Sequence, residues 1–175
     1  MIQGMDEMDT SLAAWRDLAG DLGGSFAARA RGLVSPELVL LTEAGEPFGR
    51  LAADEAGGVR LLAGTLAARI EPPTGGAYGM TAGGREVLTA EAAGSASVLT
   101  LRSGGSTYEA RISPFRNSAT ARSSERREAA RVSGGLANRR YRAIFDGQDP
   151  AALPVAVFLL HRTFALRREA YRAGS

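Results

Sequence analysis

The chain has 175 residues, 45% of them hydrophobic, which suits one domain with a sizeable core and excludes global disorder. It contains no cysteine, so disulfides and thiolate metal sites are excluded. All 21 basic residues are arginine, which is typical of a strongly GC-rich bacterial genome. No apolar run approaches the ~20 residues that span a bilayer, and the acidic start MIQGMDEMDT is not a signal peptide. We therefore expect a soluble, cytoplasmic protein.

The net charge of +2 conceals an uneven distribution along the chain. Residues 1–60 carry a net charge of −5, whereas residues 101–142 carry +7. Such asymmetry favours an anionic partner, although a self-complementary or merely solvated surface gives the same pattern.

Residues 1–24 are predicted to form a lead-in segment that packs on the outside of the main body. The stretch SLAAWRDLAGDL has the spacing of a short amphipathic helix, and Gly23-Gly24 would end it. The apolar residues near one face of this helix are Leu12, Trp15, Leu18 and Leu22.

From Ser25 onward, short segments alternate with glycine-rich turns, as in an all-β sandwich or barrel. The predicted strands are 25–32, 37–42, 47–52, 57–63, 66–71, 77–81, 85–91, 96–102, 106–113, 117–122, 128–133 and 138–145. Several of them alternate apolar and polar residues, which is typical of antiparallel strands with one buried face. A meander of this kind avoids open edges by closing on itself.

Asp149 to Arg172 is predicted to be the long helix of the chain. Asp149 is the expected N-cap and Pro150 the first helical residue, although Pro154 would allow regular helix to begin there instead. Apolar side chains from Val155 to Leu160 cover every direction around the axis, as in a helix enclosed by protein.

Beyond Leu160 the same helix is predicted to acquire one solvent-facing side. At ~100° per residue, a group of polar residues falls together on that side, opposite Thr163, Leu166 and Ala170. The polar residues are His161, Arg162, Arg168, Glu169 and Arg172, whereas Arg167 falls on the drier side.

These patterns together predict a mainly β fold. About 12 strands enclose more space than a self-filled eight-stranded barrel and less than a porin channel, which leaves room for one helix of ~10 Å diameter. We expect an antiparallel closed barrel of about 12 strands around a hydrophobic C-terminal helix. The single domain would span residues 25–175, with the helix at about 150–172.

This layout resembles the tubby C-terminal-like superfamily, which includes tubby proteins, phospholipid scramblases and LURP-one-related proteins. The resemblance rests on RRYRAIFDGQDPAALPVAVFLLHRTFALRREAYR, the hairpin LVLLTEAGEPFGRLAA and the turn-rich meander between them, over about residues 25–172. It is closest to the compact LURP-one-related and scramblase-like forms. Tubby proteins bind phosphoinositides through basic surface residues, so the resemblance implies an anionic lipid surface as a partner.

No catalytic or metal-binding motif accompanies this architecture. His161 is the only histidine and has no evident catalytic partner, so we interpret it as structural. Asp146-Gly147-Gln148-Asp149 is too short to be an EF-hand-like calcium loop, and the chain lacks a nucleophile elbow, a P-loop and a dinucleotide fingerprint. We expect neither enzymatic activity, a metal nor another cofactor.

The arginine-rich stretch carries the functional hypothesis. If its strands are neighbours, outward-facing guanidinium groups would form a patch for the phosphate of an anionic headgroup. The candidate ligand-binding residues are Arg111, Arg116, Arg122, Arg126, Arg127, Arg140 and Arg142, with Arg131 and Arg139 in the same stretch. A solvated face whose arginines pair with neighbouring glutamates explains the same residues.

The leading hypothesis is a non-enzymatic β-barrel binding module that associates peripherally with an anionic membrane or a phosphorylated ligand. The alternative is a protein-interaction or scaffold module that contacts its partner through Leu12, Trp15 and Leu18. That partner could be a second copy of the chain, which would give a homodimer. Nucleic acid ranks third, because the basic stretch offers only Tyr108, Phe115 and Tyr141 for base stacking.

Overall fold

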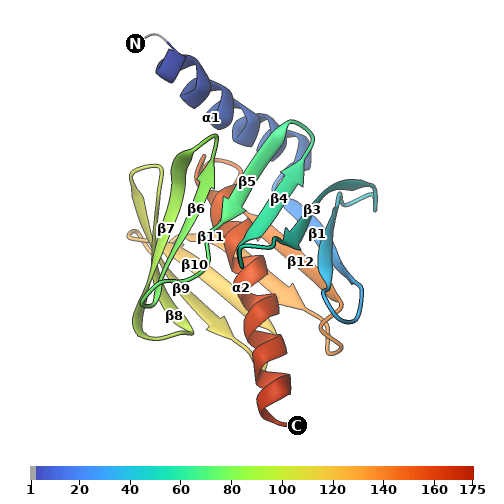
Figure 1. The fold of residues 1–175 in the computed structure, drawn as a ribbon. Helices are drawn as coiled ribbons and strands as arrows, with labels where there is room; N and C mark the ends of the chain where they lie inside the picture. Colours follow the sequence, from blue (N-terminus) through green and yellow to red (C-terminus); the bar gives the residue numbers. More distant parts are fainter. Residues whose placement is uncertain (1–2) are drawn as a thin grey trace.

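The computed structural model describes residues 3–175, with side chains from Leu12 onward. Two helices flank a run of strands: α1 spans Gln3–Leu22 and α2 spans Ala152–Ala173 (Figure 1). The strands are β1 (Ser25–Arg31), β2 (Glu37–Leu41), β3 (Pro47–Ala53), β4 (Val59–Ala63), β5 (Leu66–Ile70), β6 (Ala77–Ala82), β7 (Arg85–Ser95), β8 (Val98–Ser103), β9 (Ser106–Ser113), β10 (Ser118–Ser123), β11 (Glu128–Gly134) and β12 (Arg140–Phe145).

The strands form one closed antiparallel barrel, as predicted. Each strand pairs with its neighbours in the sequence, and β1 pairs with β12 to close the ring. Tight turns make this meander possible, because Gly104 and Gly105 between β8 and β9 both have positive φ angles, of 57° and 78°. Such turns match the right-handed twist of the flanking strands. The closed ring leaves no strand edge unpaired by another strand.

The barrel wall buries alternate residues and keeps many of them small. In β9 the buried residues are Tyr108, Ala110 and Ile112, and the residues between them are exposed. Alanine occupies many of the other inward positions: Ala28, Ala30, Ala63, Ala68, Ala82, Ala90, Ala119, Ala121, Ala130 and Ala143 are all buried. Small inward side chains leave the lumen wide enough for a helix, and α2 fills it (Figure 1).

Helix α2 is enclosed over its first half, as predicted, but its boundary with solvent lies elsewhere than expected. All residues from Ala152 to Leu160 are buried. Arg162, which the helical periodicity places on the wet side, is only 7% exposed, so that expectation is wrong. Periodicity gives the direction of a side chain, but it does not show how far along the helix the barrel wall extends.

The start of α2 also differs from the prediction. Its N-cap is Ala151, which makes no side-chain capping hydrogen bond, and not Asp149. The Asp149 carboxylate instead accepts a hydrogen bond from the Ala151 amide at 2.9 Å, in the turn before the helix. Pro154 fits inside the first turn because amides at that position have no partner within the helix.

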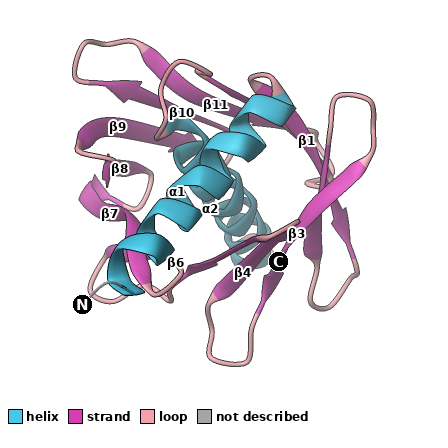
Figure 2. Ribbon diagram, turned by 90° about the horizontal axis from the view of Figure 1, so that it is seen from above, coloured by secondary structure: helices cyan, strands magenta, loops and turns pink. Residues whose placement is uncertain are grey.

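Helix α1 crosses one mouth of the barrel, over the start of α2 (Figure 2). Trp15 and Leu22 join the same hydrophobic core as the barrel and α2. Trp15 is only 3% exposed, so the exposed apolar face expected on this segment is wrong for Trp15, whereas Leu12 is exposed. We call this mouth the capped end.

The opposite mouth, where α2 leaves the barrel, is the exit end (Figure 1). In an antiparallel meander every second turn lies at the same end. The exit end therefore gathers the turns 32–36, 54–58, 71–76, 96–97, 114–117 and 135–139.

Candidate functional site

Four large apolar side chains project from turns at the exit end. Leu33 and Val34 lie in the β1–β2 turn, Phe115 in the β9–β10 turn and Leu136 in the β11–β12 turn. Their exposed fractions lie between 84% and 90%, whereas no other large hydrophobic residue among residues 12–175 is more than 53% exposed. Large apolar residues gathered at one place on a surface typically mark an interaction site.

The turns that carry these tips are held in place by hydrogen bonds. Asn117 is buried in a left-handed conformation with φ of 50°, which asparagine tolerates better than most residues. Its side-chain Nδ2 donates to the carbonyl oxygen of Gly135 at 2.8 Å, and its Oδ1 accepts from the Tyr141 hydroxyl at 3.1 Å. The turns bearing Phe115 and Leu136 are thereby joined to each other.

Helix α2 adds a second brace as it emerges. The Nη1 of Arg167 donates to the carbonyl oxygens of Pro114 and Phe115, at 2.6 and 2.9 Å. The Tyr171 hydroxyl donates to the carbonyl oxygen of Leu136 at 2.9 Å and accepts from Arg167. The apolar tips are therefore presented on a braced surface, so little order has to be gained when a partner binds them.

Positive charge gathers on the side of the exit end that carries the apolar tips, whereas Asp54, Glu55 and Glu71 lie in the exit-end turns that follow β3 and β5. Exposed arginines there have no carboxylate partner within residues 12–175: Arg29, Arg31, Arg116, Arg140 and Arg172. Half-buried Arg168 adds to them, and burial followed by the charge of Arg172 lowers its pKa. The carboxylates of Glu37 and Glu169 lie among these residues without forming an ion pair.

The structure separates the seven arginines singled out in the sequence. Strands β9 to β12 are neighbours, as expected, but Arg116 lies in an exit-end turn and Arg126 and Arg127 lie in a turn at the capped end. The other four face outward from the wall: Arg111 and Arg122 on β9 and β10, and Arg140 and Arg142 on β12.

Ion pairs leave fewer of these four wall arginines free to bind an anion. Arg111 pairs with Glu109 at 2.8 Å and Arg142 pairs with Glu43 at 3.1 Å, both at exposed positions. Arg140 instead lies opposite Arg29 of β1 in the register, close to the exit end. The seven arginines therefore do not form one patch, and Arg116 and Arg140 are the two that lie near the apolar tips.

Sequence reasoning missed the apolar tips, although a signal for them existed. Leu33, Val34, Phe115 and Leu136 occupy turn segments of the predicted meander, where polar residues are usual. Because alternate turns of a meander share an end, the predicted strands already placed these three turns at one end of the barrel. The same rule placed Arg126 and Arg127 at the opposite end from Arg116.

A polar hollow of about 520 Å³ lies at the capped end beside Tyr108, Glu125, Arg127 and Asp149. The Tyr108 hydroxyl donates to Asp149 at 2.7 Å, and burial together with that carboxylate raises the Tyr108 pKa to about 12. A tyrosine that stays protonated and a carboxylate already bonded to it and to the Ala151 amide make a structural link between β9 and α2.

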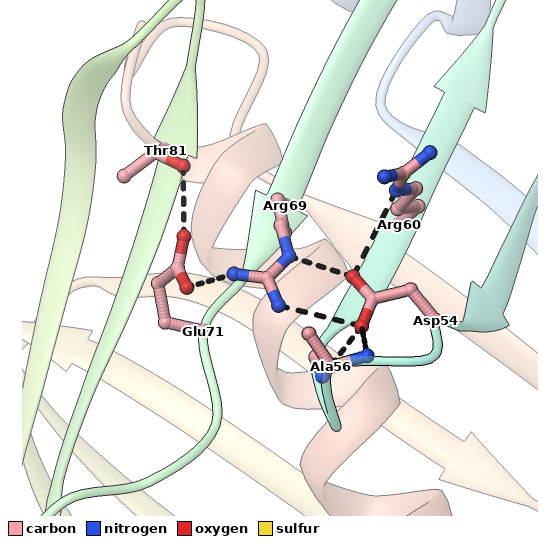
Figure 3. Close-up of polar contacts among 7 residues, drawn as sticks. Asp54, Ala56, Arg60, Arg69, Glu71 and Thr81 are labelled. Carbon is pink, nitrogen blue, oxygen red and sulfur yellow. Dashed lines mark hydrogen bonds and ion pairs between the residues drawn. The ribbon is translucent and has the colours of Figure 1, made fainter.

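A charged network on the outer wall joins β3, β5 and β6 (Figure 3). Asp54 accepts hydrogen bonds from Arg69 at 2.6 and 3.3 Å and from the amides of Ala56 and Gly58. Arg69 lowers the Asp54 pKa to about 2. Arg69 also pairs with Glu71, which accepts from Thr81 at 3.3 Å.

This network has a structural explanation. Strands β5 and β6 share only three register pairs, and the network spans that short seam. A Cβ on Gly58 would lie 2.5 Å from the Arg69 guanidinium, so glycine is needed to let that group lie against the turn. Arg60 also lies 3.8 Å from the Asp54 carboxylate, so two arginines balance two carboxylates, which leaves little to attract a ligand.

His161 lies where α2 begins to leave the wall. Its ring is half-buried, and its Nδ1 is shielded from water without a hydrogen-bond partner among the described residues. Burial, followed by the charge of Arg162, lowers the His161 pKa to about 4. The imidazole is therefore neutral at pH 7, and it has the features of a structural residue rather than a proton carrier.

Among residues 12–175, no group of three or more histidine, cysteine or acidic residues is arranged to hold a metal ion. Within the described helices, neither is long and apolar enough to cross a membrane.

Comparisons with known proteins show the fold and little else. No protein-family model matches the chain, and no curated protein does. The X-ray structure of a protein from Arabidopsis thaliana, AT5G01750, matches over 79% of this chain and 90% of its own, with a TM-score of 0.55 and 11% sequence identity. At that identity the likeness concerns architecture alone. The chain therefore shares its fold with this plant protein.

Proposed function

We propose that the chain is a non-enzymatic barrel module that docks its exit end onto a membrane containing anionic lipid. The observation that carries this proposal is the set of four exposed apolar tips, Leu33, Val34, Phe115 and Leu136, among unpaired arginines. The turns that bear Phe115 and Leu136 are also braced by hydrogen bonds. Apolar tips suit the acyl boundary of a bilayer, and arginines suit the headgroup phosphates just outside it.

The magnitudes favour the tips as the main contribution. Burying a fully exposed Leu, Val or Phe side chain is worth about 1.5–3 kcal/mol. A basic residue near an anionic surface adds ~1 kcal/mol, and salt weakens it. Binding that depends on both should therefore need anionic lipid and should weaken with salt without disappearing.

We also propose that the chain is a divergent relative of the tubby C-terminal-like superfamily. The closed meander in sequence order and the enclosed C-terminal helix support this assignment, as does the likeness to the plant protein. The superfamily's association with lipid agrees with the exit-end surface but rests on resemblance.

Co-sedimentation with vesicles tests the docking proposal. Vesicles with ~30% phosphatidylserine should retain the protein at about 50 mM salt, less at about 200 mM, and neutral phosphatidylcholine vesicles should retain little. The double variant Phe115→Ser, Leu136→Ser should lose more than tenfold in affinity for the anionic vesicles.

The matched control is Leu62→Ser, which removes an exposed apolar residue from the outer wall, away from the exit end. It should bind as the unsubstituted protein does. Equal retention of the double variant, or no retention of the unsubstituted protein at low salt, would contradict the proposal.

A further inference from the structure

The most buried arginine of the described residues lies inside the barrel without a counter-ion. Arg162 projects from α2, is 7% exposed, and has its Nε shielded from water with no hydrogen-bond partner. Among the described residues, its guanidinium makes no ion pair or hydrogen bond but lies over the ring of Tyr78, whose centroid lies 4.6 Å from Cζ. Phe158, one turn earlier on α2, makes an edge contact with the same Tyr78 ring, with ring centroids 5.9 Å apart.

Three of the four half-buried arginines satisfy their guanidinium groups with oxygen acceptors, and the fourth, Arg168, lies over the Phe164 ring near the exit end. Arg69 pairs with Asp54 and Glu71, and Arg139 donates to two carbonyl oxygens of the β1 end. Arg167 donates to the carbonyl oxygens of the β9–β10 turn. Arg162 departs from this pattern.

Two carboxylates on the same side of the barrel are already engaged, and Glu55 and Glu91 are exposed. Glu71 lies in the connection that leads into β6, but it pairs with Arg69 and accepts from Thr81 on the outer wall. Asp54 is held by Arg69 and two backbone amides. Neither is left to neutralise Arg162.

Arginine cannot reduce the cost of its burial by losing its charge. A guanidinium cannot give up its proton in a protein, so burial does not neutralise it. An unpaired buried ion costs several kcal/mol, whereas a desolvated cation–π contact returns about 2 kcal/mol. The remaining compensation has to come from water or from an anion that is not part of the chain.

We propose that Arg162 binds the phosphate or carboxylate group of a small ligand that enters the exit end of the lumen between α2 and β6. Tyr78 is the second residue of β6, which starts at that end, so the Arg162–Tyr78 pair lies near the opening. The Tyr78 hydroxyl has no partner among the described residues and is a second donor for the same anion. Arginine's planar fork matches both groups bidentately.

This site does not require membrane docking, so it is tested in solution without vesicles. Thermal unfolding is followed in chloride and, at equal ionic strength, with inorganic phosphate, octanoate or dihexanoyl phosphatidic acid below its micelle concentration. At a hundredfold excess over Kd, a bound anion should raise Tm by about 5–10 °C. Tighter binding of the phosphatidic acid than of phosphate would identify a lipid headgroup as the source, and the reverse order a free anion.

Substitutions tie any rise in Tm to the lumen. Arg162→Gln should abolish it, and Tyr78→Phe, which keeps the ring and removes only the hydroxyl, should weaken binding about tenfold. Arg122→Gln removes an exposed arginine from the outer wall of β10 and should change nothing. The Nε–H signal of Arg162 in a nitrogen–proton NMR spectrum should move on titration of the unsubstituted protein.

Three results would overturn the inference. One is the same Tm in all three anions as in chloride. Another is a rise in Tm that Arg162→Gln retains. The third, which needs no variant to fold, is a rise in Tm while the Arg162 signal stays in place.

Discussion

The two ends of the barrel treat apolar side chains in opposite ways. At the capped end α1 lies across the opening, and Trp15 is packed into the common core with 3% of its surface exposed. At the exit end the tips of the turns are exposed, and Phe115 keeps 90% of its surface in water. Both ends are ordered, since the exit-end turns are braced by Asn117 and Arg167.

The difference separates stability from binding within one fold. Apolar residues at the capped end lower the free energy of the folded chain, because the fold itself removes them from water. Those at the exit end contribute nothing of this kind until a partner covers them. Substitutions at the capped end should therefore change the free energy of unfolding, and substitutions at the exit end should change binding.

Trp15→Ala at the capped end should lower the free energy of unfolding by about 3–5 kcal/mol, because it leaves a cavity beneath α1. Phe115→Ala at the exit end should change it by less than about 0.5 kcal/mol. Denaturant titration of both variants measures this contrast. Similar losses at the two positions would show that the exit-end tips are part of the core.

Asn117→Ala tests whether the exit-end turns are braced as strongly as the structure indicates. It removes two hydrogen bonds and places alanine at φ of 50°, so the free energy of unfolding should fall by about 1–3 kcal/mol. Asn117→Gly keeps the backbone geometry and separates the two causes. An unchanged denaturation midpoint in the alanine variant would mean that the tips are carried on loose turns.

His161 lies at the boundary between the enclosed part of α2 and the exit end. The pH dependence of stability tests whether its imidazole is buried in the neutral form. Its folded-state pKa of about 4 lies below the usual ~6.5, so between these values the unfolded chain binds more protons than the folded one. Stability should be full above pH 6.5 and fall as the pH drops toward 4. Since the ring is only half-buried, we expect a loss of about 1–2 kcal/mol.

Denaturant titrations between pH 7.5 and 4.5 measure this loss above the range in which Asp54, with a pKa of about 2, contributes. His161→Asn should flatten the profile. A variant that keeps the original slope would place the responsible group elsewhere.

Removing one positive charge should change membrane affinity at the exit end only, and by a small amount. Arg116→Gln at the exit end should weaken binding to anionic vesicles by ~1 kcal/mol, about fivefold, and reduce the salt dependence. Arg127→Gln at the capped end, equally exposed, should leave binding unchanged. If both variants lose equal affinity, the membrane is recognised by overall charge and not by the exit end.

Sequence patterns predicted the architecture well because they act locally. Turn chemistry such as Ser103-Gly104-Gly105-Ser106, together with alternation in β9, located the strands, and the all-round apolar run of α2 indicated that the helix fills the lumen. The closed ring then followed from the need to cover strand edges.

The candidate site was harder to predict because it depends on which parts of the chain meet. Arg116 and Arg126 are ten residues apart in the sequence yet lie at opposite ends, since a strand separates their turns. Arg162 is buried because the barrel wall extends past its position on α2. The apolar periodicity of α2 carries no information about how far the wall extends. Proximity in sequence was therefore a poor guide to a surface built from alternate turns.

The position of the filling helix has a consequence for how the protein is made. Because α2 follows all the strands in the chain, a ribosome completes the wall before it makes the residues that occupy the lumen. At about 5–20 residues per second, synthesis from Asp146 to Ala173 takes about 1–6 s, during which the inward faces of the strands are unsatisfied. The barrel can therefore complete its core only after α2 has left the ribosome, and during that interval the nascent wall exposes apolar surface of the kind that chaperones bind.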